Sequence, residues 1–227
     1  MSDVDQEVLS KALACIEDDD WEELAPLLDE HPALMKHQEV LDYLGWLHFD
    51  LLSQAIYAKD YAEVERVISE HPDVLTSYDG NLIHWTALHL AVSESDLRLV
   101  ETLLDAGADV NQHNEPIAGG TALALAVENE EFEIAECLLE RGANPNITGW
   151  MWRTPIGKCL EGLRDTRFEE EFPRREYKDQ IAARELFERM AAIALRFDPP
   201  TYPDGTVPEF WPPTLERPVP KRVARSG

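Results

Sequence analysis

The sequence predicts an all-α fold in which pairs of short helices repeat along the chain. A segment that begins Thr-Ala-Leu occurs at Thr86 and again at Thr121, and a third start, Thr-Pro-Ile, occurs at Thr154. Thr86 and Thr121 are 35 residues apart, and Thr121 and Thr154 are 33 residues apart. The first two starts each lead to an apolar stripe at helical spacing and then to a glycine, Gly107 or Gly142, which favours a helix end.

Each repeat is expected to contain two helices. In the clearest copy, residues 87–91 form a short first helix, and a second helix carries its apolar side chains at spacings of three, three and one. These are Leu97, Val100, Leu103 and Leu104. The next copy repeats the stripe at Phe132, Ala135, Leu138 and Leu139. The small residues Ala91 and Ala126 suit a close approach of paired helices.

Two weaker copies precede these. One copy has its apolar stripe at Tyr61, Val64, Val67 and Ile68. The other, nearer the N-terminus, has it at Trp21, Leu24, Leu27 and Leu28. In both copies Glu-His-Pro replaces the glycine, and Pro32 or Pro72 stops the helix. Four second helices are therefore expected before residue 145. The first copy is rich in carboxylates, as a solvent-facing terminal repeat requires.

The fifth copy is expected to be an elongated end. Residues 154–160 open a first helix, residues 164–178 form a charged insertion that we expect to be a surface loop, and a second helix follows. Its apolar residues are Ile181, Leu186, Phe187, Met190, Ile193, Ala194 and Phe197. The expected domains are an array over 1–197, with caps at about 8–36 and 154–197, and a proline-rich tail over 198–227. The tail either packs on the cap helix or is a docking motif.

The segments at 86–91 and 103–111, repeated at 121–126 and 138–146, resemble the T-P-L-H-x-A start and G-A-D-x-N end of ankyrin repeats. The resemblance is specific over 86–156 and rests on pattern alone in the flanking regions. It implies an ankyrin-type helical solenoid of about five units with capping helices, and a binding module without an assigned partner.

Charge restricts the partners. The 227 residues include 45 acids and 20 bases, for a net charge of −25. This charge disfavours binding to nucleic acid or anionic membranes and favours another protein with a basic surface. The alternative is that the acids only keep the protein in solution. We expect a monomer.

Three isolated cysteines, Cys15, Cys137 and Cys159, are typical of buried free thiols in a reducing compartment. The acidic first residues lack the hydrophobic region of a signal peptide, and no apolar run reaches the roughly 20 residues that span a bilayer. We therefore expect a cytoplasmic protein.

In the ankyrin family, variable residues lie on the finger loop before each Thr start and on the exposed side of each first helix. Here the fingers are rich in aromatic residues, which often anchor interfaces. The finger candidates for partner binding are Tyr43, Trp46, Phe49, Tyr78, Trp85, His113, Trp150, Trp152 and Arg153. The resemblance implies that Trp85 and Arg153 are exposed. The alternative is that the fingers bury their own aromatic rings.

The first helices add Tyr57, Glu94 and Glu128 as candidates, because these residues occupy corresponding exposed positions. Together they predict a row of acidic residues on the concave face, with helices about 10 Å apart. A merely solvated acidic face is the alternative.

Motifs for catalysis are absent. The sequence contains no phosphate-binding glycine loop and no H-E-x-x-H, and its many acids single out no catalytic pair. His89 belongs to the repeat start and is expected to bond within and between repeats. A zinc site from His37, His48 or His84 is the remaining metal hypothesis. We expect no enzyme, no cofactor and no metal.

The leading hypothesis is therefore a non-catalytic protein-interaction module that uses finger loops and an acidic concave face. One alternative is an acidic inhibitor or immunity-type protein that neutralises a basic partner such as a nuclease. Another is a scaffold that recruits proteins through its proline-rich tail.

Overall fold

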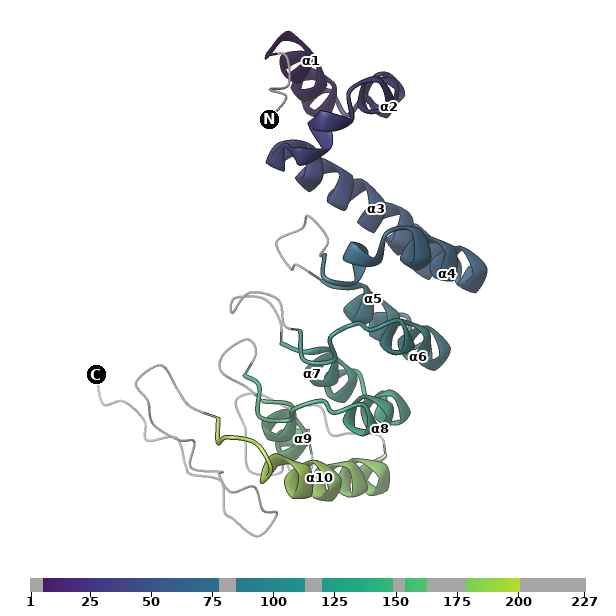
Figure 1. Ribbon diagram of the computed structural model, residues 1–227. Helices are drawn as coiled ribbons and strands as arrows, with labels where there is room; N and C mark the ends of the chain where they lie inside the picture. The colour runs from purple at the N-terminus through teal and green to yellow at the C-terminus, as the bar shows by residue number, and fades with distance from the viewer. Residues whose placement is uncertain (1–5, 78–84, 113–119, 149–153, 163–178, 201–227) are drawn as a thin grey trace, which may run out of the picture.

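The computed structural model describes residues 6–77, 85–112, 120–148, 154–162 and 179–200. These residues form paired α-helices and no β-strand, and the pairs stack into one elongated array (Figure 1). The pairs are α1 (Gln6–Glu17) with α2 (Trp21–Glu30), α3 (Gln38–Ala58) with α4 (Tyr61–Glu70), α5 (Ala87–Ser93) with α6 (Leu97–Asp105), α7 (Ala122–Glu128) with α8 (Phe132–Glu140), and α9 (Pro155–Gly162) with α10 (Gln180–Ala194). The expected all-α architecture is confirmed.

The turns inside the first four pairs share one geometry. Each contains a residue with positive φ, and the next backbone N–H donates to a carbonyl five residues before it, with N···O distances of 2.8 to 3.3 Å. The accepting residues are Cys15, Ala55, Ala91 and Ala126. The weak copies therefore align with the clear ones as the sequence predicted. The expected total of about five units stays a prediction.

The helix boundaries follow from capping residues. Thr86 and Thr121 accept hydrogen bonds from backbone N–H groups of α5 and α7, and Thr154 does so for Gly157 of α9. The His-Pro pairs end α2 and α4 as predicted, and each proline starts a 3₁₀ turn, η1 (Pro32–Lys36) or η2 (Pro72–Leu75). Gly107 and Gly142 have φ of +100° and +92°, so the glycine ends are confirmed.

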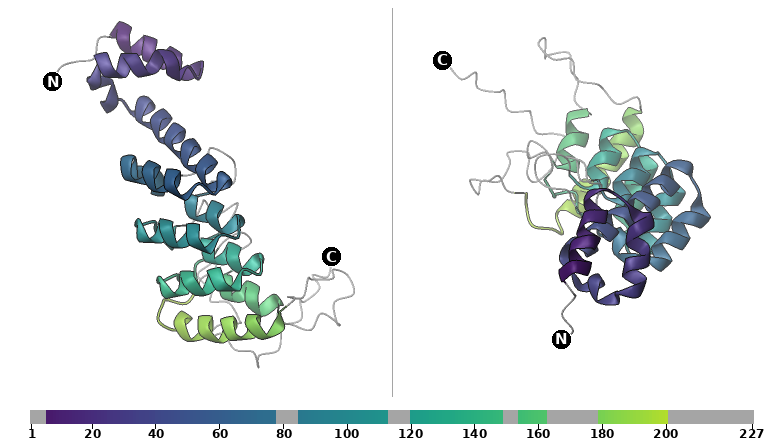
Figure 2. Two further views of the ribbon diagram at one scale, coloured as in Figure 1. Left: turned by 90° about the vertical axis from the view of Figure 1, so that its right-hand side faces the viewer. Right: turned by 90° about the horizontal axis from the view of Figure 1, so that it is seen from above.

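Helix α3 differs from the structure predicted for this part of the chain. The segment around residues 43–49 was predicted to be a finger loop, but it belongs to one helix of 21 residues. The N-terminal half of α3 packs through Val40, Tyr43 and Leu44 into a core shared with α1, α2 and η1. Its C-terminal half packs into a second core that extends to α10. Helix α3 thus joins the first pair to the rest of the stack (Figure 2).

The last described helix closes the other end of the array. Leu186, Phe187 and Met190 are buried in the main core, as predicted, but Ile181 is 74% exposed at the start of α10. The buried Asn146 side chain donates from Nδ2 to the carbonyls of Ala194 and Asp198, so it links the segment after α8 to the end of α10 and the residues that follow. The insertion at 164–178 and residues 201–227 of the tail lie outside the described residues.

The three cysteines are free. Cys15 and Cys159 are buried, whereas Cys137 is only half-buried, which corrects its expected position. Burial raises the pKa of the Cys159 thiol to about 12, so this thiol is protonated at neutral pH. Among the described helices, none combines the length and the apolar composition needed to cross a membrane.

Candidate protein-interaction surface

The first helices of successive pairs stack directly on one another. Helix α3 contacts α5, α5 contacts α7, and α7 contacts α9. Tyr57, Ser93 and Glu128 each lie two residues before the positive-φ residue of their turn, so they occupy equivalent positions. Stacked helices lie roughly 8–10 Å apart, which is a spacing that a partner protein can span with successive side chains. We call this side of the stack, formed by the first helices and their turns, the inner face.

Carboxylates predominate on the inner face. Within the described residues, the cations of the first helices and their turns are Lys11, Lys59 and Lys158. The acids there are Glu7, Glu17, Asp18, Asp19, Asp20, Glu39, Asp42, Asp50, Asp60, Glu94, Asp96, Glu128, Glu130 and Glu131. From α1 to the turn after α7, the inner face therefore carries more negative than positive charge.

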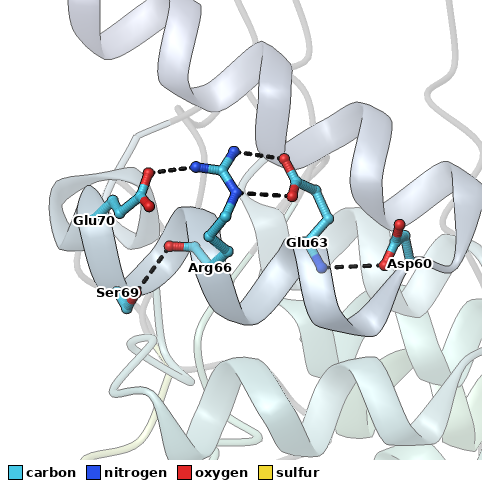
Figure 3. A network of polar contacts seen from close by, with 5 residues as sticks. All are labelled: Asp60, Glu63, Arg66, Ser69 and Glu70. Carbon is cyan, nitrogen blue, oxygen red and sulfur yellow. Dashed lines mark hydrogen bonds and ion pairs between the residues drawn. The ribbon is translucent and has the colours of Figure 1, made fainter.

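Arginines are placed differently. Where the structure describes an arginine, it lies on a second helix or just after one: Arg66, Arg98, Arg141, Arg184, Arg189 and Arg196. Arg66 on α4 lies between Glu63 and Glu70 and binds both carboxylates (Figure 3). Its guanidinium lowers the pKa of Glu63. The second helices from α4 onward thus balance part of their own negative charge, whereas α2 carries four acids and no cation.

Several arginines of the second helices also link neighbouring pairs. We call the side of the stack formed by the second helices the outer side. Arg141 at the end of α8 binds Asp105 of α6 at 2.6 Å, and Arg189 of α10 binds Glu136 and Glu140 of α8. The Arg98 guanidinium lies 3.9 Å from the centroid of the Tyr61 ring. The Arg141–Asp105 pair is exposed and the Arg189 pairs are partly exposed, so each contributes little to stability. Six of the ten described lysines and arginines therefore lie on the second helices or just after them.

Several polar contacts connect neighbouring pairs at or near their turns, among them a hydrogen bond from the Ser95 hydroxyl to Glu131. The Tyr61 hydroxyl donates to Asp96 at 2.9 Å, which raises the pKa of Tyr61, and Lys59 lies 3.8 Å from the same carboxylate. Lys158 binds Glu128, one of the predicted partner-binding residues. Glu128 is exposed, yet its charge is partly compensated. Glu94 is half-buried, and its carbonyl accepts from Lys59 at 3.3 Å.

His89 has the expected role. Its Nδ1 lies 2.8 Å from the Thr86 hydroxyl, and its Nε2 lies 3.0 Å from the Gly120 carbonyl of the next repeat. Both ring nitrogens are used, and the side chain is buried. This residue holds the stack together and is unavailable to a partner.

The aromatic residues predicted for the first finger divide into two groups. Tyr43 is 8% exposed and Phe49 is 2% exposed, so the prediction that they contact a partner is wrong. Burial and a hydrogen bond to Asp19 raise the pKa of Tyr43 to about 12. Trp46 and Tyr57, by contrast, are 42% and 55% exposed on α3. The Trp46 ring centroid lies 6.0 Å from that of Tyr43.

Two histidines meet where α3 passes from one core to the other. The rings of His48 and His71 are stacked, with centroids 3.5 Å apart and planes 15° apart. Burial lowers the pKa of His48, the neighbouring His71 lowers it further, and Asp73 raises it. The pair links α3 to the end of α4.

The second-finger candidate Trp85 is half-buried and packs against the main core, which corrects its expected exposure. The other finger candidates lie outside the described residues: Tyr78, His113, Trp150, Trp152 and Arg153. Sequence reasoning also missed Trp21, which was assigned to an apolar stripe and is 41% exposed. The three aspartates directly before Trp21 were the available signal of a surface turn.

No cluster of His, Cys, Asp and Glu suitable for a metal ion occurs within the ranges that the structure describes, although His84 lies outside them. What the described geometry provides is a charged, partly aromatic surface, which is suited to recognising another macromolecule.

Comparison with known families supports this assignment. A family model described as ankyrin repeats, in three copies, matches residues 52–149. A search of curated proteins finds no matching relative. Ankyrin repeats typically mediate protein–protein interactions and usually lack catalytic activity. Residues 52–149 of this chain therefore belong to the ankyrin repeat family.

Proposed function

We propose that this protein is a non-catalytic interaction module that binds a basic surface of another protein through its inner face. The observation that carries the proposal is that the described arginines are absent from the first helices and their turns. The described arginines follow the second helices, whereas the first helices and their turns bear many carboxylates and three lysines. A partner with lysines and arginines complements the inner face.

Glu94 and Glu128 are central to this proposal, because they lie at neighbouring turns of successive first helices. A partner cation near Glu128 competes with Lys158 for that carboxylate. The overall charge of −25 attracts a basic protein over longer distances and speeds its association. Affinity and association rate should therefore both fall as salt is added.

The proposal takes residues 1–197 as one binding unit, with terminal caps at about 8–36 and 154–197, and leaves the proline-rich residues 198–227 outside it. In repeat arrays each unit contacts only its neighbours, so partner contacts can extend over several units. The proposed unit thus includes the α1–α2 pair as well as the matched repeats.

The test is capture of partners on the immobilised full chain, followed by elution in a salt gradient and identification by mass. A parallel column carries Glu94→Lys with Glu128→Lys. A second carries Glu101→Lys with Glu133→Lys, which makes the same charge change on exposed residues of the second helices α6 and α8. The proposal predicts basic proteins that are retained by the wild type and the second variant and lost from the first. Equal retention by all three columns contradicts it.

The same experiment addresses the inhibitor alternative. A single basic enzyme that elutes only at high salt, and whose activity the pure protein blocks, would support an acidic inhibitor over a general adaptor. The net charge of −25 is the observation that favours this second candidate.

A further inference from the structure

Helix α3 carries a stripe of alternating acidic and aromatic side chains between residues 42 and 57. The stripe consists of Asp42, Trp46, Asp50 and Tyr57, at spacings of four, four and seven residues. These spacings place all four side chains on one face of a helix, over about 22 Å. Asp42, Trp46 and Tyr57 are exposed, and Asp50 is half-buried. We call this set the α3 stripe.

The α3 stripe lies apart from the residues that α3 contributes to its two cores. Those core residues include Val40 and Leu44 in the first core and Leu52 and Ile56 in the second. The stripe is also well supported. Gln38 donates to Asp42 at 2.7 Å and Gln54 donates to Asp50 at 2.6 Å, so same-helix amides orient both carboxylates.

Trp46 lies against a buried residue of its own helix, Tyr43. The Tyr43 ring lies 6.0 Å from it, and the Tyr43 hydroxyl is held by Asp19 at 2.8 Å. A buried, hydrogen-bonded tyrosine thus backs the exposed tryptophan. An interface anchor held in this way loses little conformational freedom on binding.

The surroundings of the α3 stripe are both acidic and apolar. Residues 6–58 contain no arginine, two lysines (Lys11 and Lys36) and twelve acids. The acids are Glu7, Glu17, Asp18, Asp19, Asp20, Glu22, Glu23, Asp29, Glu30, Glu39, Asp42 and Asp50. The same region holds most of the exposed large apolar side chains of the described residues, namely Trp21, Met35, Leu41, Trp46, Leu51 and Tyr57. This combination fits a partner that is basic and apolar at once.

We propose that the α3 stripe is the docking strip for an amphipathic helix of a partner protein that carries arginines one or two turns apart. The inference rests on the proposed partner-binding function and specifies the partner's chemistry. An arginine guanidinium stacks on an aromatic ring and donates to a carboxylate one turn away, which a lysine does less well. Asp42 and Asp50 are about 12 Å apart along the axis, which matches arginines seven or eight residues apart. Helix-in-groove recognition reads side chains at this spacing.

The proposed strip lies largely before the matched ankyrin segment, which begins at residue 52. The occupant is therefore recognised by residues 42–50 of α3 together with Tyr57, on the part of the inner face that precedes most of the matched repeats. Two other occupants have similar chemistry: a second copy of the chain, and residues 217–227, which contain Arg217, Lys221, Arg222 and Arg225 without an acid. The experiment below separates them.

The probe is a fluorescein-labelled helical peptide of alanine and leucine with arginine at every fourth position, and its binding to the full chain is measured by fluorescence anisotropy. The proposal predicts saturable binding that a lysine version of the peptide weakens. Trp46→Ala and Tyr57→Ala should each weaken binding roughly two- to thirtyfold, the range expected for a lost cation–π contact. Asp42→Asn with Asp50→Asn keeps the shape of the stripe and should weaken binding as well.

Leu195→Ala is the control, because Leu195 is an exposed apolar residue just after α10, at the other end of the array from the stripe. It should leave the dissociation constant unchanged, and circular dichroism should show the same helical content in every variant. Equal binding by the wild type and all stripe variants overturns the proposal.

The other occupants give different results. If the peptide binds only after Arg222→Glu with Arg225→Glu, residues 217–227 are the occupant. If the molecular mass of the wild type doubles as its concentration rises, and Trp46→Ala prevents this, the occupant is a second copy of the chain. Both outcomes overturn the proposed partner helix. If the peptide fails while captured basic proteins still depend on Glu94 and Glu128, the strip is wrong and the proposed function stands. If no protein is captured at any salt, the proposed function itself fails.

Discussion

Burial separates the residues that hold this fold from those that can contact a partner, and the tryptophans show the difference. Trp85 is half-buried against the main core, whereas Trp46 is 42% exposed on α3. Trp85→Ala should lower the free energy of unfolding by about 1–3 kcal/mol, because it removes packed apolar area. Trp46→Ala should change it by less than about 1 kcal/mol. Urea denaturation followed by circular dichroism measures both, and equal losses would contradict this division.

His48 makes stability depend on pH. Its pKa is lowered from 6.5 in the folded state, first by burial and then by the stacked His71, so the folded state binds protons less readily than the unfolded state. The contribution of His48 is therefore complete above pH 6.5 and is lost as the pH falls towards the lowered pKa. His48→Phe should flatten the decline of unfolding free energy below pH 6.5.

Asp73 allows a test of the direction in which His48 makes stability depend on pH. Because Asp73 raises the pKa of His48, Asp73→Asn should lower that pKa further and make the decline steeper. Denaturant titrations at several pH values between 5 and 8 compare the three proteins. A steeper decline in His48→Phe, or a shallower one in Asp73→Asn, would contradict the explanation.

Gly45 and Gly107 have opposite effects on the stability of their helices. Gly45 lies inside α3, and a Cβ at this position would meet nothing within 4 Å, so Gly45→Ala should stabilise the protein by up to about 1 kcal/mol. Gly107 ends α6 with φ of +100°, so Gly107→Ala should destabilise it by about 1 kcal/mol or more. Thermal unfolding of both variants provides the comparison. Shifts of melting temperature in the same direction would be inconsistent with these roles.

Helix α3 shows what the sequence predicts poorly. The apolar residues of its two halves follow the helical period, but they face different directions, because each half packs into a different core. The change of face falls near Gly45 and His48, where the pattern resembles a break. By contrast, the helices after Thr86 and Thr121 were predictable, because capping threonines, apolar stripes and terminal glycines agree at every position.

In the whole molecule, the composition gives the net charge, but it does not show how lysines and arginines are distributed between the first and the second helices. The sequence indicated the acids at Glu94 and Glu128, yet the partial compensation of Glu128 by Lys158 depends on the stacking of α7 and α9. Likewise, the commitment of Arg141 and Arg189 to carboxylates of neighbouring pairs depends on how the second helices align. The acidic inner face therefore emerges only when the pairs are assembled.

The most direct test of the proposed function is the association rate constant of a purified captured partner, measured against ionic strength. The wild type should associate fast at low salt and more slowly as salt screens the inner face. Glu94→Lys with Glu128→Lys should slow association at low salt and flatten this dependence, whereas Glu101→Lys with Glu133→Lys should stay closer to the wild type. Identical salt dependence in the two variants would contradict binding through the inner face.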